Sequence, residues 1–424
     1  TAYEIYQCDW SSDVCSSDLD KVFRTEKRNV SSNETKCFTP RNKMFRYLKL
    51  SVYLYEQAII CIDSANNYIL STYHKADVPE PSGPTMDLTA TNIVIATGAK
   101  PRPLPGNPFA GALIDSTQAL EVNEFPSSAV IIGAGAIALE FASMWNAAGS
   151  KVTLLIRKDR VLSAWDRRAG TTLTRELKRH GVNIITRASV THVDTGANLG
   201  ATVHYTREGQ DGEQSVWGEI ALVAIGRDPI TDPAWGVTID DHGHVATDAY
   251  GRTDKPGVWA VGDVTAGHAL AHRAFEQGIV IAETIAGLNP KPVDEATVPQ
   301  IVFSFPEAAS VGLTVEQAQA REDLIEIKET NYPMLANARM LMSGTAGSLT
   351  IVSGCDAANP DTPRVLGVHM VSQMASDIIA EAEQLVGNHV PLADAARLVH
   401  PHPTFSETLG EALLKADGRP LHTR

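Results

Sequence analysis

The feature that most constrains the fold is a glycine-rich turn between an apolar run and a helical pattern. Residues 129–140 read AVIIGAGAIALE, and a second apolar run, KVTLLI, follows at 151–156. Gly133 can form the tight turn after a strand, and Gly135 has no Cβ to keep a pyrophosphate away from the backbone. Ala138 allows the helix to pack closely on the strand. The pattern predicts a strand–turn–helix–strand unit that binds a dinucleotide; a plain glycine turn is the alternative.

The predicted phosphate-binding segment extends into the helix, because a helix N-terminus offers free N–H groups and a positive dipole end to an anion. Its residues are Gly133, Ala134, Gly135, Ala136, Ile137, Ala138, Leu139 and Glu140.

The end of the second strand indicates which nucleotide is preferred. A unit that prefers NAD carries Asp or Glu there, to accept hydrogen bonds from the ribose hydroxyls. This chain has Ile156, followed by Arg157 and Arg160. Because a guanidinium binds phosphate in a bidentate manner, the sequence favours NADP(H). A solvated basic loop is the other interpretation.

Length and charge set the wider frame. A chain of 424 residues is too long for one hydrophobic core, so we expect several domains. Residues 51–71 contain short β-prone runs. Strand and helix patterns alternate from residue 92, and residues 300–424 mix both. This order predicts α/β domains with parallel sheets followed by an α+β domain.

The net charge of −14 argues against nucleic acid or an anionic membrane as partner. No apolar run reaches the roughly 18 residues that span a bilayer. Five cysteines are too few for a disulfide scaffold, so we expect a cytoplasmic protein.

Two other predicted strands end in a glycine or in a glycine followed by an aspartate. NIVIATG (92–98) ends in Thr97 and Gly98, and GVWAVGD (257–263) ends in Asp263. A carboxylate at the C-terminal edge of a sheet can hydrogen-bond a sugar or ribityl hydroxyl. Taken alone, each motif is also an ordinary strand end.

The segment HPHPTFSE (400–407) contains a candidate acid–base pair. His402 and Glu407 are separated by a turn that contains proline. A carboxylate that orients an imidazole raises its basicity and makes it a general base. His400 competes for this role. In the structural alternative, Ser406 or Thr404 caps the following helix and the histidines only pack.

Five motifs in this order resemble the class I pyridine nucleotide–disulfide oxidoreductase family, and within it the dihydrolipoyl dehydrogenases. They are ATGAKPRPLPG (96–106), GAGAIALE (133–140), AIGRDP (224–229), GVWAVGDVTAGHALAHRAFEQG (257–278) and HPHPTFSE (400–407). The resemblance covers residues 88–424. It implies two Rossmann-like dinucleotide-binding domains, the FAD one incomplete, and a C-terminal α+β dimerisation domain. The FAD domain would comprise 46–105 and 246–297, the NAD(P) domain 106–245 and the interface domain 298–424.

The resemblance also implies roles for residues. Asp263 would lie at the ribityl–phosphate region of FAD, the segment Ala269, Leu270, Ala271 and His272 would lie near its isoalloxazine ring, and Gly226 would line the NAD(P) site. His402, held by Glu407, would be the base that serves the partner subunit's active site in a homodimer. Electrons would pass between a dithiol, an enzyme disulfide, FAD and NAD(P), with a lipoyl-bearing protein as one candidate substrate.

The N-terminal region departs from the family pattern. Residues 1–90 contain one glycine, Gly83, and the cysteines show no CxxxxC spacing, so the first GxGxxG and the redox disulfide are both missing. Codons for residues 1–19 can be written as the two arms of a common short-read sequencing adapter. We therefore expect a truncated chain whose residues 1–45 are artefactual or disordered, and which binds FAD weakly and lacks dithiol–NAD(P) activity.

Three functions remain open. The first is a dihydrolipoyl dehydrogenase-like flavoprotein present as a fragment. The second is an NADPH-dependent disulfide or metal-ion reductase of the same family, which Arg157 and Arg160 favour. The third is a non-catalytic NAD(P)-binding relic.

Overall fold

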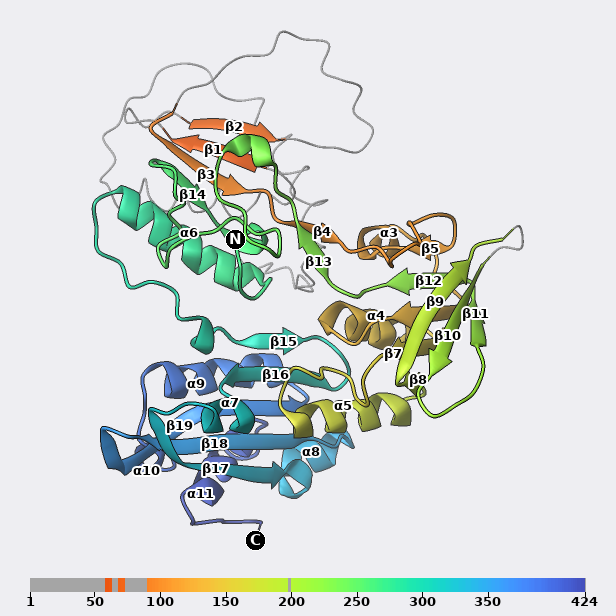
Figure 1. Ribbon diagram of the computed structural model, residues 1–424. Helices are drawn as coiled ribbons and strands as arrows, with labels where there is room; N and C mark the ends of the chain where they lie inside the picture. Colours follow the sequence, from red (N-terminus) through yellow and green to blue (C-terminus); the bar gives the residue numbers. More distant parts are fainter. Residues whose placement is uncertain (1–57, 63–67, 73–89, 197–199, 424) are drawn as a thin grey trace, which may run out of the picture. The chain divides into compact units, whose positions relative to one another are not determined.

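The computed structural model describes residues 58–62, 68–72, 90–196 and 200–423 (Figure 1). The chain divides into two compact units, Thr1–Lys100 with Arg227–Glu295, and Pro101–Gly226 with Ala296–Arg424. The sequence placed residues 227–245 in the NAD(P) domain, whereas here they belong to the unit that contains residues 246–295. The N-terminal segment 1–45 lies outside the described residues.

The first unit contains a four-stranded sheet in the order β14-β3-β1-β2. Its strands are β1 (Ala58–Ile62), β2 (Tyr68–Thr72), β3 (Asn92–Ala96) and β14 (Val258–Ala260). β3 and β14 are parallel, whereas β1 pairs antiparallel with β2 and β3, so the β-prone runs form a hairpin. Helix α6 (Ala271–Ile285) packs Ile281 against Val94 and Trp259.

Short elements surround this sheet or lie near the unit boundaries. They are β4 (Ala99–Pro101), β13 (Arg227–Pro229), η1 (Pro233–Trp235), η2 (Gly262–Val264) and η3 (Glu295–Thr297), and β4 pairs with β13.

The second unit begins with a parallel five-stranded sheet in the order β5-β12-β6-β7-β8. Its strands are β5 (Leu113–Ile114), β6 (Ser128–Ile132), β7 (Lys151–Ile156), β8 (Asn183–Thr186) and β12 (Ile220–Val223). The helices of this part are α3 (Ser116–Leu120), α4 (Ala136–Ala147) and α5 (Arg167–Arg179). Both faces of such a sheet must be covered, which explains why β6 and β7 are almost continuously apolar.

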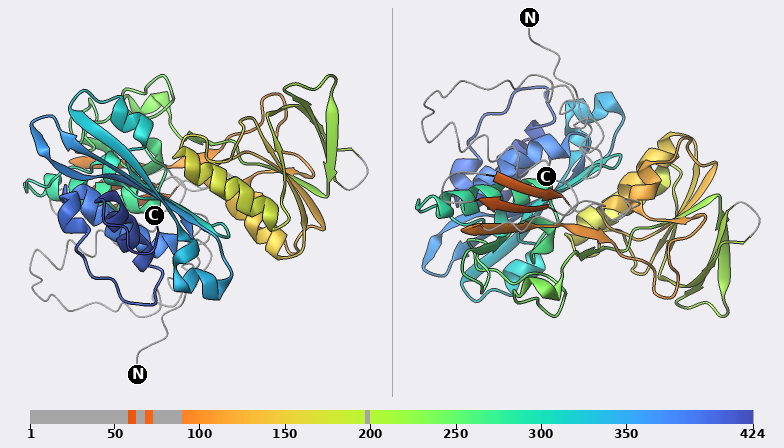
Figure 2. Two further views of the ribbon diagram at one scale, coloured as in Figure 1. Left: turned by 90° about the horizontal axis from the view of Figure 1, so that it is seen from below. Right: turned by 90° about the horizontal axis from the view of Figure 1, so that it is seen from above.

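Helices cover one face of this sheet and a second sheet covers the other (Figure 2). On the helical side, Trp145 and Leu173 are fully buried. On the other side lies an antiparallel sheet of β9 (Ala188–Asp194), β10 (Ala201–Arg207) and β11 (Gln214–Gly218). Val203 and Tyr205 of β10 point into the shared core. The parallel sheet is therefore the middle of three layers.

The C-terminal part is built on an antiparallel sheet in the order β15-β16-β19-β18-β17. Its strands are β15 (Gln300–Val302), β16 (Glu307–Gly312), β17 (Leu324–Pro333), β18 (Ser348–Asp356) and β19 (Asn359–Ser372). Its helices are α7 (Val315–Gln319), η4 (Met334–Ala336), α8 (Ala338–Ser343), α9 (Ala375–Gly387), α10 (Leu392–Ala395) and α11 (Glu407–Ala416). The α/β class with a C-terminal α+β domain is confirmed. Among the helices in the described parts of the chain, none has both the length and the apolar character that a bilayer crossing requires.

Candidate functional site

The glycine turn lies between β6 and α4, at the carboxyl edge of the parallel sheet. Gly133 has φ of +144°, and a Cβ at this position would lie 2.1 Å from the carbonyl oxygen of Ala224. Its N–H donates to the carbonyl of Leu155 at 3.1 Å. Gly133 is therefore required by the backbone path itself, with or without a ligand.

Gly135 has a different role in the same turn. It is the N-cap of α4 with φ of −90°, it makes no side-chain cap, and a Cβ built on it would meet nothing within 4 Å. The first turn of α4 contains no acidic residue. Uncapped N–H groups next to open space form a ready anion site, so this helix N-terminus fits a pyrophosphate. Ala138 is fully buried behind it.

The sheet order brings other predicted cofactor residues to this edge. β12, β6 and β7 are parallel neighbours, so their carboxyl ends lie side by side. Ile156 ends β7 and is buried. Gly226 follows β12 with φ of +130°, and its carbonyl accepts the N–H of Arg102 at 3.0 Å. Ligands of open α/β sheets bind at such edges, where the strand order reverses.

The two arginines that favoured NADP(H) differ in surroundings. Arg160 has a side-chain exposed fraction of 16%, pairs with Asp159 at 3.2 Å and donates to the carbonyl of Ser163 at 3.1 Å. Its guanidinium also packs on Gly170, where a Cβ would lie 3.3 Å from Nε. Arg160 thus stabilises the segment between β7 and α5, whereas Arg157 is exposed.

In the first unit, two predicted strand ends lie at one edge because β3 and β14 are parallel neighbours. Thr97 is buried and donates from Oγ1 to the carbonyl of Ile230 at 2.6 Å, and the N–H of Ile230 donates to the carbonyl of Gly98 at 2.9 Å. Asp263 lies half-buried in η2. The Gly262 N–H donates to Gln277 of α6 at 3.0 Å, which joins η2 to this helix.

The segment predicted to face a flavin ring forms the start of α6. Leu270 is the N-cap without a side-chain cap, and Ala271 begins the helix, with Ala269 before it and His272 after it. Within the described residues, this unit could hold the sugar and ribityl end of a flavin nucleotide. Those residues contain no second glycine turn of the kind at 133–138 for its ADP end.

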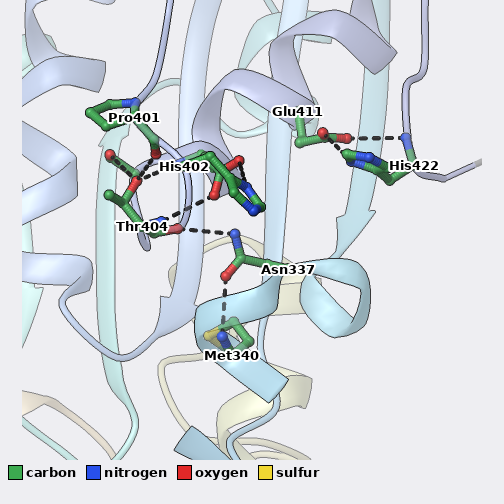
Figure 3. A network of polar contacts seen from close by, with 9 residues as sticks. Asn337, Met340, Pro401, His402, Thr404, Glu411 and His422 are labelled. Carbon is green, nitrogen blue, oxygen red and sulfur yellow. Dashed lines mark hydrogen bonds and ion pairs between the residues drawn. The ribbon is translucent and has the colours of Figure 1, made fainter. Parts of the chain in front are cut away.

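His402 and Glu407 form a hydrogen-bonded pair at the start of α11 (Figure 3). His402 Nδ1 lies 2.8 Å from Glu407 Oε1, and Glu407 Oε2 accepts the N–H of Thr404 at 3.0 Å. The side chain of His402 is 68% exposed and that of Glu407 is 16% exposed. The carboxylate is thus fixed at two points, while the imidazole keeps its Nε2 edge open.

The sequence did not identify the residue that holds this loop in place. Asn337 is buried, caps α8 through the N–H of Met340 at 3.1 Å, and donates from Nδ2 to the carbonyl of Thr404 at 3.0 Å (Figure 3). An Asn before a helix predicts a cap. Nothing in the sequence indicates that the same side chain reaches the histidine loop.

His400 lies on the inner side of the same loop. Its side chain is 9% exposed and its Nε2 is 2.9 Å from Glu381 of α9. A Cβ on Gly410 of α11 would lie 2.4 Å from its Nδ1, so the ring fills the space that this glycine leaves. The hydrogen bond to Glu381 raises the pKa of His400, and burial opposes this shift. These contacts give His400 a packing role.

Cys355, the cysteine whose side chain the described residues include, lacks the features of a redox thiol. Cys355 lies in β18, is fully buried and is free. Burial raises the pKa of its thiol, which disfavours the thiolate that disulfide exchange needs.

Comparison with known proteins gives a consistent result. Residues 21–278 match the family described as Pyridine nucleotide-disulphide oxidoreductase, and residues 298–413 match the dimerisation domain of that family. The dihydrolipoyl dehydrogenase of Cupriavidus necator is 38% identical over 341 residues, which cover 79% of this chain and 70% of that protein. Dihydrolipoyl dehydrogenase 3 of Pseudomonas aeruginosa is 37% identical over 352 residues, covering 79% and 71%.

Solved structures agree in fold. The HOCl-induced flavoprotein disulfide reductase RclA from Escherichia coli superposes with a TM-score of 0.68 at 26% identity, over 77% of this chain and 74% of that one. LpdA from Mycobacterium tuberculosis gives a TM-score of 0.69 at 24% identity, over 85% and 74%. The match to the family begins at residue 21, after the adapter-like residues 1–19 but inside the segment 1–45 that the sequence predicted to be artefactual or disordered.

The two turn glycines allow a test that separates fold from ligand. We expect Gly133→Ala to lower the free energy of unfolding by about 2 kcal/mol or more, because its φ and the Ala224 carbonyl exclude a Cβ. Gly135→Ala should change stability by only about 0.5 kcal/mol but weaken NAD(P)H binding about tenfold, since its Cβ would enter the phosphate space. Urea unfolding and nucleotide titration measure both effects. If both variants changed stability and nucleotide binding to the same extent, the distinction between a fold-required Gly133 and a ligand-contacting Gly135 would be wrong.

The pH dependence of stability tests the packing role of His400. Its folded-state pKa is raised above the unfolded value of about 6.5, so the stabilisation by Glu381 is complete below that pH and is lost as the pH rises through the folded pKa. We expect His400→Gln to lower the free energy of unfolding more at about pH 5.5 than at about pH 8.5, as urea unfolding at the two pH values measures. Glu381→Gln is the matched control and should show the same trend. A cost independent of pH would argue against the pair.

Proposed function

Because the chain belongs to the pyridine nucleotide-disulphide oxidoreductase family, we propose that it takes part in flavin-dependent electron transfer between a dithiol and NAD(P), as in dihydrolipoyl dehydrogenases. In this reaction the dithiol becomes a disulfide, NAD(P)⁺ accepts a hydride equivalent, and one proton is released. FAD, when bound, carries the two electrons between the sulfur and nicotinamide partners. The dithiol would be a lipoyl group or a related substrate.

The observation that carries this proposal is the His402–Glu407 pair. A carboxylate accepts a hydrogen bond from Nδ1–H, which leaves the Nε2 lone pair available to take a proton from a substrate thiol. Glu407 is fixed in turn by the N–H of Thr404. The exposure of His402 leaves its ring accessible to a substrate or to a second protomer.

A homodimer fits the surroundings of this loop. Val399 is 95% exposed and Leu398 is 50% exposed, directly before the histidine segment. Leu341 and Met342 of α8 are also largely exposed. Apolar side chains of this kind in a domain of the dimerisation type favour contact with a partner protomer. In the proposed dimer, His402 serves the active site of the partner subunit.

The nucleotide would bind at the carboxyl edge of the parallel sheet. The uncapped N-terminus of α4 and the open space at Gly135 support a pyrophosphate there. Gly226, which follows β12 at the same edge, would line the rest of the site. Gly133 serves as the comparison for Gly135, because the backbone requires a glycine at 133 whether or not a nucleotide is bound.

The proposal includes a statement about the gene. The printed sequence has no CxxxxC pair, and its residues 1–19 resemble translated adapter, so we propose that it is a fragment of a longer reading frame. Resequencing the locus from independent DNA tests this. We expect an in-frame GxGxxG and CxxxxC upstream; recovery of the same junction would refute it.

Activity of the protein with its natural N-terminus tests the role of His402. General acid–base catalysis contributes a factor of about 10² to 10⁴, so His402→Gln should lower kcat for dithiol oxidation about a hundredfold or more while leaving nucleotide binding unchanged. Glu407→Gln should have a smaller effect in the same direction. His400→Gln is the control and should keep most of the activity. Full activity of the His402→Gln enzyme would end the proposal.

A second candidate, an NADPH-dependent disulfide reductase, rests on the exposed Arg157 after the buried Ile156. If Arg157 binds a 2′-phosphate, NADPH should bind about tenfold more tightly than NADH, and Arg157→Ala should remove that preference without changing NADH affinity. Titration of both nucleotides measures this. Lys178→Ala, which removes an exposed charge in the last turn of α5, is the control and should leave both affinities unchanged. Equal affinity for both nucleotides would exclude this second candidate and leave the dihydrolipoyl dehydrogenase-like function as the one proposal.

A further inference from the structure

A pair of stacked histidines lies on the antiparallel sheet of the second unit, in a place that the proposed function does not use. His192 of β9 and His204 of β10 are direct cross-strand partners. Their ring centroids are 4.1 Å apart and the ring planes are inclined by only 8°. Corresponding ring nitrogens therefore point to the same side, so the pair presents two nitrogens along each edge.

A carboxylate faces each edge of this pair. Glu213, just before β11, places its two oxygens 3.7 Å from the Nδ1 atoms of His192 and His204. Asp194 places Oδ2 at 3.1 Å from Nε2 of His204 and at 3.9 Å from Nε2 of His192. Each edge thus has two ring nitrogens and one carboxylate. The carboxylate of Glu213 is equally far from both rings, whereas that of Asp194 is closer to His204.

We propose that Nδ1 of His192, Nδ1 of His204 and the carboxylate of Glu213 bind a divalent transition-metal ion of the Zn²⁺ class. One ligand atom from each residue lies within 4.8 Å of the others. Zn²⁺ bonds to imidazole and carboxylate span about 2.0–2.2 Å, so donors around one ion are up to about 4 Å apart. Because the lone pairs of two nearly parallel rings run side by side, the rings must also tilt toward each other for one ion to lie in both ring planes. His192 and Glu213 are both more than two-fifths exposed, which leaves space for this movement.

The hydrogen bonds around the three ligands support the choice of the Nδ1 edge. A histidine that binds a metal donates its other ring N–H to a carboxylate, which fixes the tautomer. Asp194 is in position to accept Nε2–H from His204 at 3.1 Å, which leaves the Nδ1 lone pair for the ion. Thr191 donates from Oγ1 to Glu213 Oε1 at 2.6 Å and orients that carboxylate.

The donor set also defines the class of ion. Two imidazoles and one carboxylate suit Zn²⁺, Cu²⁺ and Ni²⁺, whereas Mg²⁺ and Ca²⁺ require mostly oxygen ligands. Three protein ligands leave a fourth position for water or another small ligand. The alternative role is a surface ion-pair cluster, which contributes little to stability and needs no ion.

Titration of Zn²⁺ into the full chain tests the site, with the His204→Asn variant beside it. We expect the chain to bind one more equivalent of Zn²⁺ than the variant. If both bind the same number of equivalents, the chain should bind one of them at least tenfold more tightly. Asp194→Asn should weaken binding about tenfold through the tautomer alone. His242→Asn, an exposed histidine outside the cluster, is the control and should match the parent chain. Subtraction between chain and variant removes binding by cysteines elsewhere in the sequence.

Two further readouts make the result decisive. Co²⁺ in place of Zn²⁺ should give the intense visible absorption of a four-coordinate site, and His204→Asn should abolish it. If His204→Asn is not folded by circular dichroism, Glu213→Gln provides the same comparison from an exposed position outside the strand. Identical Zn²⁺ isotherms for the chain and the folded variant would overturn the proposal, as would equal binding of Mg²⁺.

Discussion

One close approach between two backbone segments organises the second unit. The turn after β6 passes the carbonyl of Ala224 at a distance that leaves no room for a Cβ at Gly133. The N–H of Ala224 donates to the carbonyl of Ile132 at 2.8 Å, which joins the carboxyl ends of β12 and β6 beside this approach. Gly135, two residues further on, begins α4 without a side-chain cap. The proposed phosphate site would therefore be formed by backbone geometry and would depend little on particular side chains.

The sequence was most informative where a local pattern has one physical solution. AVIIGAGAIALE predicted β6, the turn and α4, because the glycines, the apolar strand and the small Ala138 agree with one another. It was less informative where distant segments decide a side chain's surroundings. Arg160 was grouped with Arg157 as a phosphate ligand, but its position depends on Gly170 of α5, and no spacing along the chain indicates that contact. Asn337 and Thr404 likewise meet across 67 residues.

The histidine loop illustrates how burial resolves an ambiguity that composition leaves open. His400 and His402 are two residues apart before the same Glu407, so the residues alone left both open as the base. In the structure, Gly410 leaves space for the ring of His400, and Glu381 of α9 pairs with it inside the domain. His402 pairs with Glu407 at the surface, while the N–H of Thr404 holds the carboxylate. His400 is thus enclosed between Glu381 of α9 and Gly410 of α11, whereas the ring of His402 is exposed.

Strand alternation explains why the second unit has room for a metal site that does not disturb its core. Along β10, Ala201, Val203 and Tyr205 point inward and pack against the parallel sheet, so His204 must point outward. The pairing register then places His192 of β9 opposite it, and a register shift follows at His204/Tyr205. Because the outward face contributes nothing to the core, its side chains can change without loss of the fold. Core packing therefore does not explain why four titratable side chains converge on this face, and the proposed metal site rests on that convergence.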